Sequence, residues 1–201
     1  ISGKFKDMKN IEQELKLSLT KREYNILHSL GNGEDVTQEN FYYYYDNMPL
    51  TTMVRVRRKQ DKYTLCFKSA ISSRDSVAVN REIECEITKG LADSFEEKGI
   101  TQQQLSMMLG IVMPQPLRCI GSLITNRKII SINGLNAELD CNNYLGVTDY
   151  ELECECDDVS RLESLKHFLE YNYGITAKPS ESKSKRFADR LAGIPMLLED
   201  V

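Results

Sequence analysis

The sequence has few histidines and lacks the closely paired cysteines that build zinc sites, and it carries no excess of positive charge. It contains two histidines and six cysteines, and no two cysteines form a C-x-x-C pair, so a structural zinc site is not expected. The net charge of −4 and the pI of about 5.4 argue against a general nucleic-acid binder, which needs a strongly basic surface. No apolar run approaches the length of a membrane span, and no signal peptide is visible.

What remains is an ordinary globular composition. Hydrophobic residues make up 41% and charged residues 28% of the 201 residues, which is enough to build one substantial domain. No linker or low-complexity segment divides the chain, so a single domain over 1–201 is the simplest interpretation. Residues 1–7 are interpreted as a leader or tag remnant before a natural start at Met8. Free thiols at apolar strand positions fit a reducing cytoplasm.

The main signal is an alternation of charged and apolar residues. At 10–19, Glu12, Glu14 and Lys16 occupy every second position, and the positions between them become apolar from Leu15 onward. Residues two apart in a strand share a face, so one face is charged and the other apolar. The alternation recurs at Arg55 and Arg57, at Lys68, at Glu82, Glu84 and Glu86, and at Glu151, Glu153 and Glu155.

Each such strand taken alone is typical of a sheet with one solvated face. Taken together, the strands segregate their charges, with acidic residues on some and arginines on another. Like charges on one face repel unless a counter-ion lies among them. Acidic strands therefore indicate a divalent metal, and arginines indicate phosphate, because the guanidinium donates two parallel hydrogen bonds. A sheet with both could hold a metal–polyphosphate complex.

The pattern predicts about eight strands with helices between them. The strands are expected at 10–19, 38–46, 51–59, 62–69, 77–88, 120–132, 136–144 and 150–156, and the helices at 21–30, 90–110 (divided near 99–101), 159–173 and 185–192. Polar loops are expected at 72–75 and 178–185. Eight strands suffice to close a barrel around a small ligand. The predicted fold is α+β: a closed antiparallel β-barrel with a charged interior and with helices packed outside.

Several motifs, in order along nearly the whole chain, resemble one family. Its pattern begins with Glu12-x-Glu14-x-Lys16 and continues with the segment 38–46 and with Arg55-x-Arg57. The later matches are Lys68, Arg81-Glu82-Ile83-Glu84, Arg127, Asp140, Glu151-x-Glu153 and Lys183-Ser184-Lys185. The chain resembles the CYTH superfamily, the triphosphate tunnel metalloenzymes, and within it the small bacterial CYTH proteins.

The resemblance implies a tunnel that holds a triphosphate with Mg²⁺ or Mn²⁺. The residues expected to bind phosphate are Lys16, Arg55, Arg57, Lys68 and Arg127, with Lys183 or Lys185 closing over the terminal phosphate. The expected metal ligands are Glu12, Glu14, Asp140, Glu151 and Glu153, and the expected catalytic residues are Glu151, Glu153 and Lys16. Glu82 and Glu84 are expected to hold a basic side chain in place or to join a second metal site.

The preferred function is metal-dependent hydrolysis of inorganic triphosphate or of a small organic or nucleoside triphosphate, because no base-recognition motif is visible. The alternatives are a class IV-type adenylate cyclase, a non-catalytic module that binds triphosphate or nucleotide, and a barrel whose inner charges are structural ion pairs. Neither a nucleic-acid nor a membrane partner is expected. The sequence leaves open the choice between monomer and homodimer, and the number of metal ions.

Overall fold

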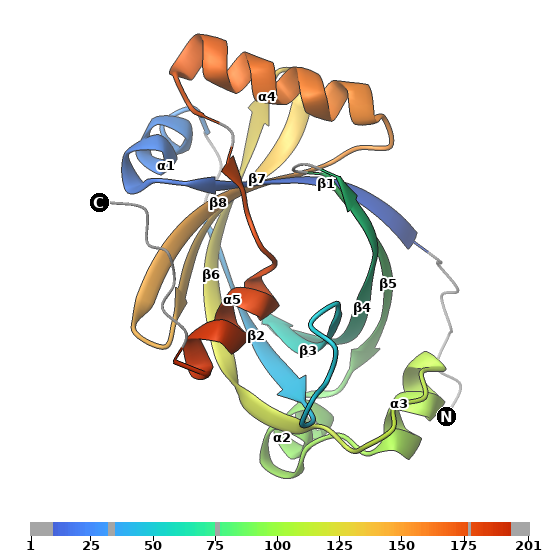
Figure 1. Cartoon of the computed structure of the whole chain (residues 1–201). Helices are drawn as coiled ribbons and strands as arrows, with labels where there is room; N and C mark the ends of the chain where they lie inside the picture. Colours follow the sequence, from blue (N-terminus) through green and yellow to red (C-terminus); the bar gives the residue numbers. More distant parts are fainter. Residues whose placement is uncertain (1–9, 32–34, 75–76, 177, 194–201) are drawn as a thin grey trace. The chain divides into compact units, whose positions relative to one another are not determined.

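The computed structural model describes residues 10–31, 35–74, 77–176 and 178–193 (Figure 1). The predicted leader, 1–7, and Met8 lie outside these residues. The strands are β1 (Asn10–Leu19), β2 (Val36–Tyr44), β3 (Thr52–Lys59), β4 (Lys62–Arg74), β5 (Val77–Ile87), β6 (Arg118–Ile132), β7 (Leu135–Tyr144), β8 (Val147–Glu155) and β9 (Lys178–Pro179). The helices are α1 (Lys21–His28), α2 (Lys89–Lys98), α3 (Gln102–Leu109), α4 (Val159–Tyr173) and α5 (Lys183–Leu191).

The hydrogen-bonded order of the strands closes on itself. The order is β5-β4-β3-β2-β6-β7-β8-β1-β9, and β5 also pairs with β1. The pairs β1–β8, β2–β3, β3–β4, β6–β7 and β7–β8 are antiparallel. The short β9 adds to β1 outside this ring. The predicted closed antiparallel barrel of about eight strands is therefore confirmed.

By their internal contacts the residues form two compact units. Of the described residues, unit 1 comprises 10–11, 38–70 and 80–122, and unit 2 comprises 12–31, 35–37, 71–74, 77–79, 123–176 and 178–193. Each unit has its own hydrophobic core.

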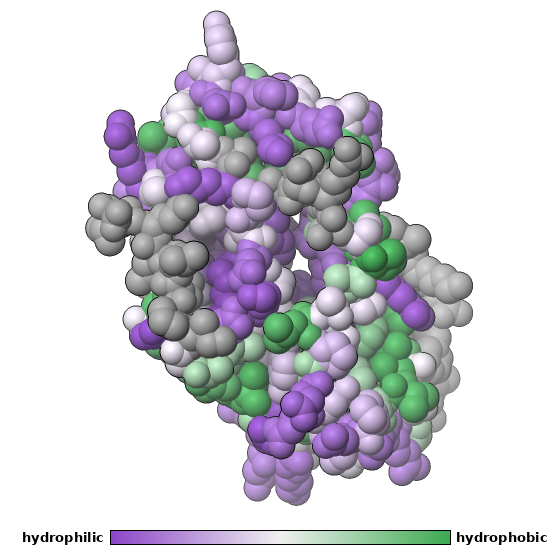
Figure 2. All heavy atoms as spheres, viewed as in Figure 1, coloured by the Kyte–Doolittle hydropathy of each residue, from purple (hydrophilic) through white to green (hydrophobic). Residues whose placement is uncertain are grey.

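The core of unit 2 lies between its strands and two helices. The apolar positions of the alternating pattern, such as Leu17 on β1 and Leu152 on β8, are fully buried in it. Helix α4 closes this core with Leu162, Leu165 and Leu169. In Figure 1, α1 and α4 lie on one side of β1, β7 and β8, and α5 lies on the other. Hydrophilic residues predominate over α4 in the space-filling view (Figure 2), as expected for a helix with one buried face.

The core of unit 1 is built in the same way. Val54 and Val56 of β3 and Leu65 of β4 pack with Phe95 of α2. The tyrosine run of β2 contributes to it, since Tyr43 is fully buried in this cluster. The charged members of the strands therefore occupy the face opposite the helices of their own unit.

Local sequence signals set the helix starts. Thr20 and Thr101 form capping boxes with Glu23 and Gln104 at the starts of α1 and α3. Ser182 caps α5 by accepting a hydrogen bond from the backbone N–H of Lys185. Helix α5 therefore starts at Lys183, earlier than the predicted 185, and the segment predicted as a polar loop contains both β9 and the first turn of α5.

The turns between strands agree with the sequence, whereas one strand is longer than its composition predicts. Lys59 pairs with Lys62 across a two-residue turn, as predicted, and Gln60 in that turn has a left-handed φ of 54°. The turn at Asn133–Gly134 is also confirmed, with φ values of 50° and 69°. The polar residues from 72 to 74, predicted as loop, instead extend β4 to Arg74, while residue 75 lies outside the described part. Among the described residues, no helix has the length and apolar character needed to cross a membrane.

Candidate functional site

Strand register brings charged residues of unit 2 together on the face opposite α1 and α4. Lys16 of β1 pairs with Glu153 of β8. Asp140 of β7 pairs with Glu151 of β8 on one side and with Arg127 of β6 on the other. Directly opposed residues have side chains on the same face. Four strands therefore supply one charged cluster, which contains the candidate residues Lys16, Arg127, Asp140, Glu151 and Glu153.

Three buried carboxylates form the centre of this cluster. Asp140, Glu151 and Glu153 each offer an oxygen atom, and these atoms all lie within 4.8 Å of one another. Asp140 and Glu151 are fully buried, and Glu153 is 8% exposed. Three carboxylates this close and this dry require cations, because the interior screens their mutual repulsion poorly.

Basic side chains of the same unit supply those cations. Arg127 makes a bidentate contact with Asp140, with Nε–Oδ1 and Nη2–Oδ2 distances of 2.7 and 2.6 Å. Its Nη2 also donates to Glu153 at 2.9 Å. The ammonium of Lys16 lies 2.5 Å from Glu153. Basic residues of the chain itself therefore act as counter-ions for these carboxylates.

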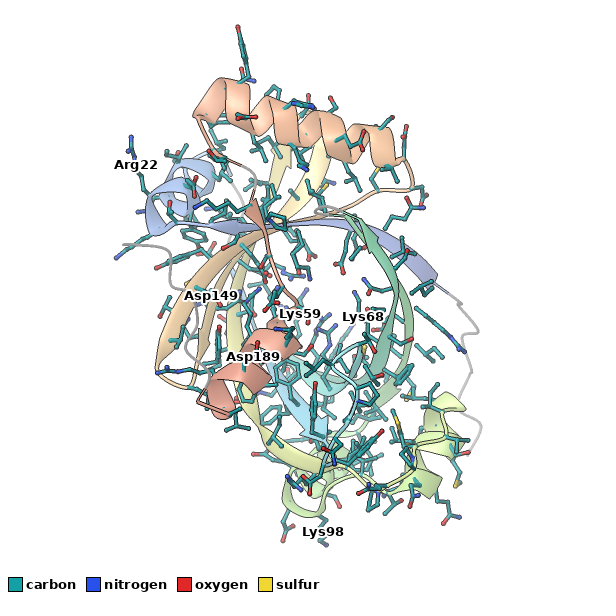
Figure 3. The ribbon with its side chains drawn as sticks, viewed as in Figure 1. Arg22, Lys59, Lys68, Lys98, Asp149 and Asp189 are labelled. Carbon is teal, nitrogen blue, oxygen red and sulfur yellow. The ribbon has the colours of Figure 1, made fainter. Side chains whose placement is uncertain are left out.

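Helix α5 adds two further cations to the cluster. The Nζ atom of Lys183 lies 2.8 Å from Asp140 and 3.1 Å from Glu153, and it also pairs with Glu151. Arg186, one helical turn later, donates to Glu151 at 2.9 Å and to Asp149 at 3.0 Å. Figure 3 shows Asp149 beside α5, whereas Arg22 on α1 points away from the sheet. Lys183 and Arg186 are both buried.

These contacts keep the acids ionised despite their burial. Burial raises the pKa of Glu151, but Arg186 and Lys183 outweigh it and bring the pKa to about 2. The pKa of Glu153 is likewise raised by burial and lowered, well below its ordinary value, by Lys16, Lys183 and Arg127. Burial lowers the pKa of Lys183, yet the three carboxylates raise it overall. The cluster is therefore charged at neutral pH.

Unit 1 holds a second, more basic cluster on strands β2 to β5. Glu82 of β5 receives Arg55 of β3 at 3.4 Å and Lys68 of β4 at 3.3 Å. Arg57 donates its Nε–H to the side-chain oxygen of Asn40 at 3.1 Å. Burial raises the pKa of Glu82, but Arg55 and Lys68 lower it to about 2. Three basic side chains, those of Arg55, Lys68 and Arg57, thus act on the one carboxylate of Glu82.

Comparison with known proteins decides the family. A model of the CYTH domain family matches residues 10–188. The chain belongs to the CYTH family. No curated protein sequence matches it.

Solved structures share the CYTH fold. A proposed adenylate cyclase from Bacillus halodurans is 26% identical with a TM-score of 0.72, and the alignment covers 90% of this chain and 99% of that one. HpAC1 from Hippeastrum, a proposed adenylyl cyclase described as having a dominant triphosphatase activity, is 23% identical with a TM-score of 0.73. Its alignment covers 94% of this chain and 99% of that one.

The carboxylates of this CYTH protein fit a hard divalent cation. Asp140, Glu151 and Glu153 offer only oxygen atoms, which Mg²⁺ and Mn²⁺ prefer. Their oxygens are close enough for one ion to contact more than one of them, directly or through water. Lys183 holds all three, so a metal ion and this ammonium group compete for the same oxygens.

The structure separates some predicted site residues from both clusters. Lys185 pairs with Glu181 and Asp189 along α5, so of the two predicted lysines Lys183 is the one that reaches the carboxylates. Glu84 is exposed, unlike Glu82. Glu14, by contrast, is buried and lies 3.6 Å from Lys16 of the unit 2 cluster. The side chain of Glu12 lies outside the described part of the chain.

Sequence reasoning missed three members of the unit 2 cluster. Arg186 binds Glu151 and Asp149, and Glu138 pairs with Arg127. A usable signal existed for each one. Arg186 follows Lys183 by three residues on a helix, Asp149 precedes Glu151 by two on a strand, and Glu138 precedes Asp140 in the same way, so each shares a face with a predicted residue.

Proposed function

We propose that this CYTH protein hydrolyses triphosphates in a reaction that requires Mg²⁺ or Mn²⁺. The observation that carries the proposal is the cluster of three buried carboxylates, each in contact with Lys183, in a chain that belongs to this family. The substrate class is inorganic triphosphate or a small organic triphosphate. The family match runs through both units, which supports treating them as one functional domain, and free cysteines support a cytoplasmic location.

The residues of unit 2 divide into two roles. Asp140, Glu151 and Glu153 hold the metal ion, which when bound supplies a Lewis acid that offsets phosphate charge. Lys16 and Arg127 bind phosphate oxygens, because they are the basic groups already held beside these carboxylates. Lys183 moves its ammonium from carboxylate to phosphate oxygens, and this role rests on its position among all three acids.

Hydrolysis then needs a positioned water molecule. Its oxygen forms a bond to the terminal phosphorus while the bond from that phosphorus to the bridging oxygen breaks. The diphosphate part of the substrate leaves with the electron pair, and the water proton passes to a phosphate oxygen or to solvent. Glu153 is a weak base, because Lys16 and its other cations keep its pKa low. We therefore assign Glu151 and Glu153 to metal binding and to orienting the water, rather than to removing its proton before attack.

Purely structural ion pairs are the less economical explanation. Replacing buried ion pairs with apolar groups of similar volume is often neutral or stabilising. A cluster that includes three carboxylates, Arg127, Lys183 and Arg186 is therefore more charge than folding requires. Binding of a metal ion and a phosphate group explains why these charged side chains are present, whereas the stability of the fold does not.

Cyclisation is the second candidate, favoured by the 26% identity to a proposed adenylate cyclase. In that reaction the ribose 3′-hydroxyl attacks the α-phosphorus of ATP and pyrophosphate leaves, with the hydroxyl proton released. Hydrolysis of ATP instead consumes water and yields no cyclic nucleotide. The products formed from ATP therefore separate the two candidates.

We expect Arg55→Ala and Arg57→Ala each to weaken binding of inorganic triphosphate about 10- to 100-fold, the range for a charged hydrogen bond to phosphate. The affinity for inorganic phosphate should fall less, because this smaller ligand makes fewer contacts with the basic side chains. Isothermal titration calorimetry measures both. Arg58→Ala is the matched control: Arg58 is on the same strand, its side chain is 51% exposed, and it pairs with Glu39. Unchanged triphosphate affinity in both test variants would remove unit 1 from the binding site.

A further inference from the structure

Cys66 is the one cysteine that lies within a charged cluster of unit 1. It sits on β4 between Leu65 and Phe67, which belong to the hydrophobic core. By strand alternation its thiol lies on the opposite face, with Lys68. Only 1% of Cys66 is exposed. The sequence offers no reason to place a small, weakly polar side chain among charged ones.

The thiol makes a specific contact there. Cys66 Sγ donates to Oε1 of Glu82 at 3.0 Å, the same carboxylate that receives Arg55 and Lys68. Burial raises the pKa of Cys66 to about 12, although the nearby Arg55 opposes this. The thiol is therefore neutral and carries its proton at neutral pH, as a hydrogen-bond donor must.

The distances suggest what the contact does. Arg55 and Lys68 lie 3.4 and 3.3 Å from Glu82, longer than the roughly 2.7–2.9 Å of a strong charge-assisted hydrogen bond. Around Glu153 in unit 2, by comparison, the cations lie at 2.5–3.1 Å. The thiol contact, at 3.0 Å, is shorter than both cation contacts of Glu82 and adds a third directional constraint on its carboxylate, at Oε1.

We propose that Cys66 is a positioning residue: its thiol anchors the Glu82 carboxylate, which in turn orients Arg55 and Lys68 toward the phosphates of the substrate. This inference rests on the proposed function. When triphosphate binds, Arg55 and Lys68 keep their contacts with Glu82 and donate their other N–H groups to phosphate oxygens. Because the thiol of Cys66 holds the carboxylate in one orientation, Arg55 and Lys68 are already oriented for phosphate before the substrate binds.

Three variants test this role in the full chain: Cys66→Ala, Cys66→Ser and Cys85→Ala. Alanine removes the donor, whereas serine restores one. Cys85 is half-buried on β5 of the same unit and packs against the hydrophobic core, so its alanine variant controls for the loss of a thiol. We expect Cys66→Ala to raise KM for inorganic triphosphate about fivefold with kcat within about twofold, since uniform binding is lost. Cys66→Ser should stay near wild type.

The outcomes separate the inference from the function on which it rests. Wild-type KM in Cys66→Ala, or a KM in Cys66→Ser as high as in Cys66→Ala, would overturn the positioning role while the triphosphatase proposal stands. A wild-type protein that neither binds nor hydrolyses inorganic triphosphate would reject both. Circular dichroism and thermal melting of each variant verify that the altered KM belongs to a folded protein.

Discussion

Replacing Glu153 with glutamine is expected to lower turnover of inorganic triphosphate about 100-fold or more, the scale for losing a metal ligand or a major electrostatic contact. Glu153 receives Lys16, Arg127 and Lys183. Glutamine keeps the shape and can still accept a hydrogen bond, but it removes the charge that attracts the metal ion. The measurement is phosphate release under saturating substrate, with Mg²⁺ and with Mn²⁺.

The matched control is Glu155→Gln. Glu155 lies on the same strand and is exposed, so the same chemical change there should leave turnover within about twofold, as for most exposed positions. Circular dichroism should show the native fold in both variants. Equal activities of Glu153→Gln and wild type would show that this carboxylate takes no part in the reaction.

Lys183→Met is expected to destabilise the protein by about 3 kcal/mol, because breaking a buried charge network leaves carboxylates without their partner. Only 8% of the Lys183 side chain is exposed. Lys185→Met, with a side chain 32% exposed and its partners on the same helix, should cost less than about 1 kcal/mol. Urea unfolding measures the free energy of unfolding of each variant.

Metal ions give this pair of variants a second readout. A divalent cation can replace the positive charge that Lys183 supplies to Asp140, Glu151 and Glu153. Adding Mg²⁺ should therefore raise the melting temperature of Lys183→Met more than that of wild type or of Lys185→Met. Equal gains in all three proteins would mean that the metal ion and Lys183 do not share these oxygens.

Alternation in the sequence was enough to assign each charged side chain to a face. Lys16, Glu151 and Glu153 all lie opposite the hydrophobic core of their unit, as the period of two requires. Alternation does not determine, however, which positions on the charged face of a strand are buried and which are exposed. Glu82 and Glu84 share a face by their spacing, yet Glu82 meets Arg55 while Glu84 is exposed.

The sequence pattern could not predict contacts between residues that lie far apart in the sequence. Arg186 and Lys183 come from a helix that folds back onto β7 and β8, so their partners depend on tertiary packing. For the same reason, strands that look purely acidic or purely basic in sequence turn out to neutralise one another within unit 2. The contact between Cys66 and Glu82 could not be predicted either, because a single cysteine on a strand forms no recognisable sequence pattern.

The central claim is that the buried carboxylates support metal-dependent hydrolysis of triphosphates. The most direct measurement treats the wild-type chain with EDTA, removes the chelator, and follows phosphate and cyclic nucleotide released from inorganic triphosphate and from ATP as Mg²⁺ or Mn²⁺ is added back. The account predicts no product without metal, phosphate from inorganic triphosphate once metal is present, and no cyclic AMP from ATP. Undiminished phosphate release after EDTA treatment, no phosphate release with either metal, or cyclic AMP as the main product from ATP would contradict it.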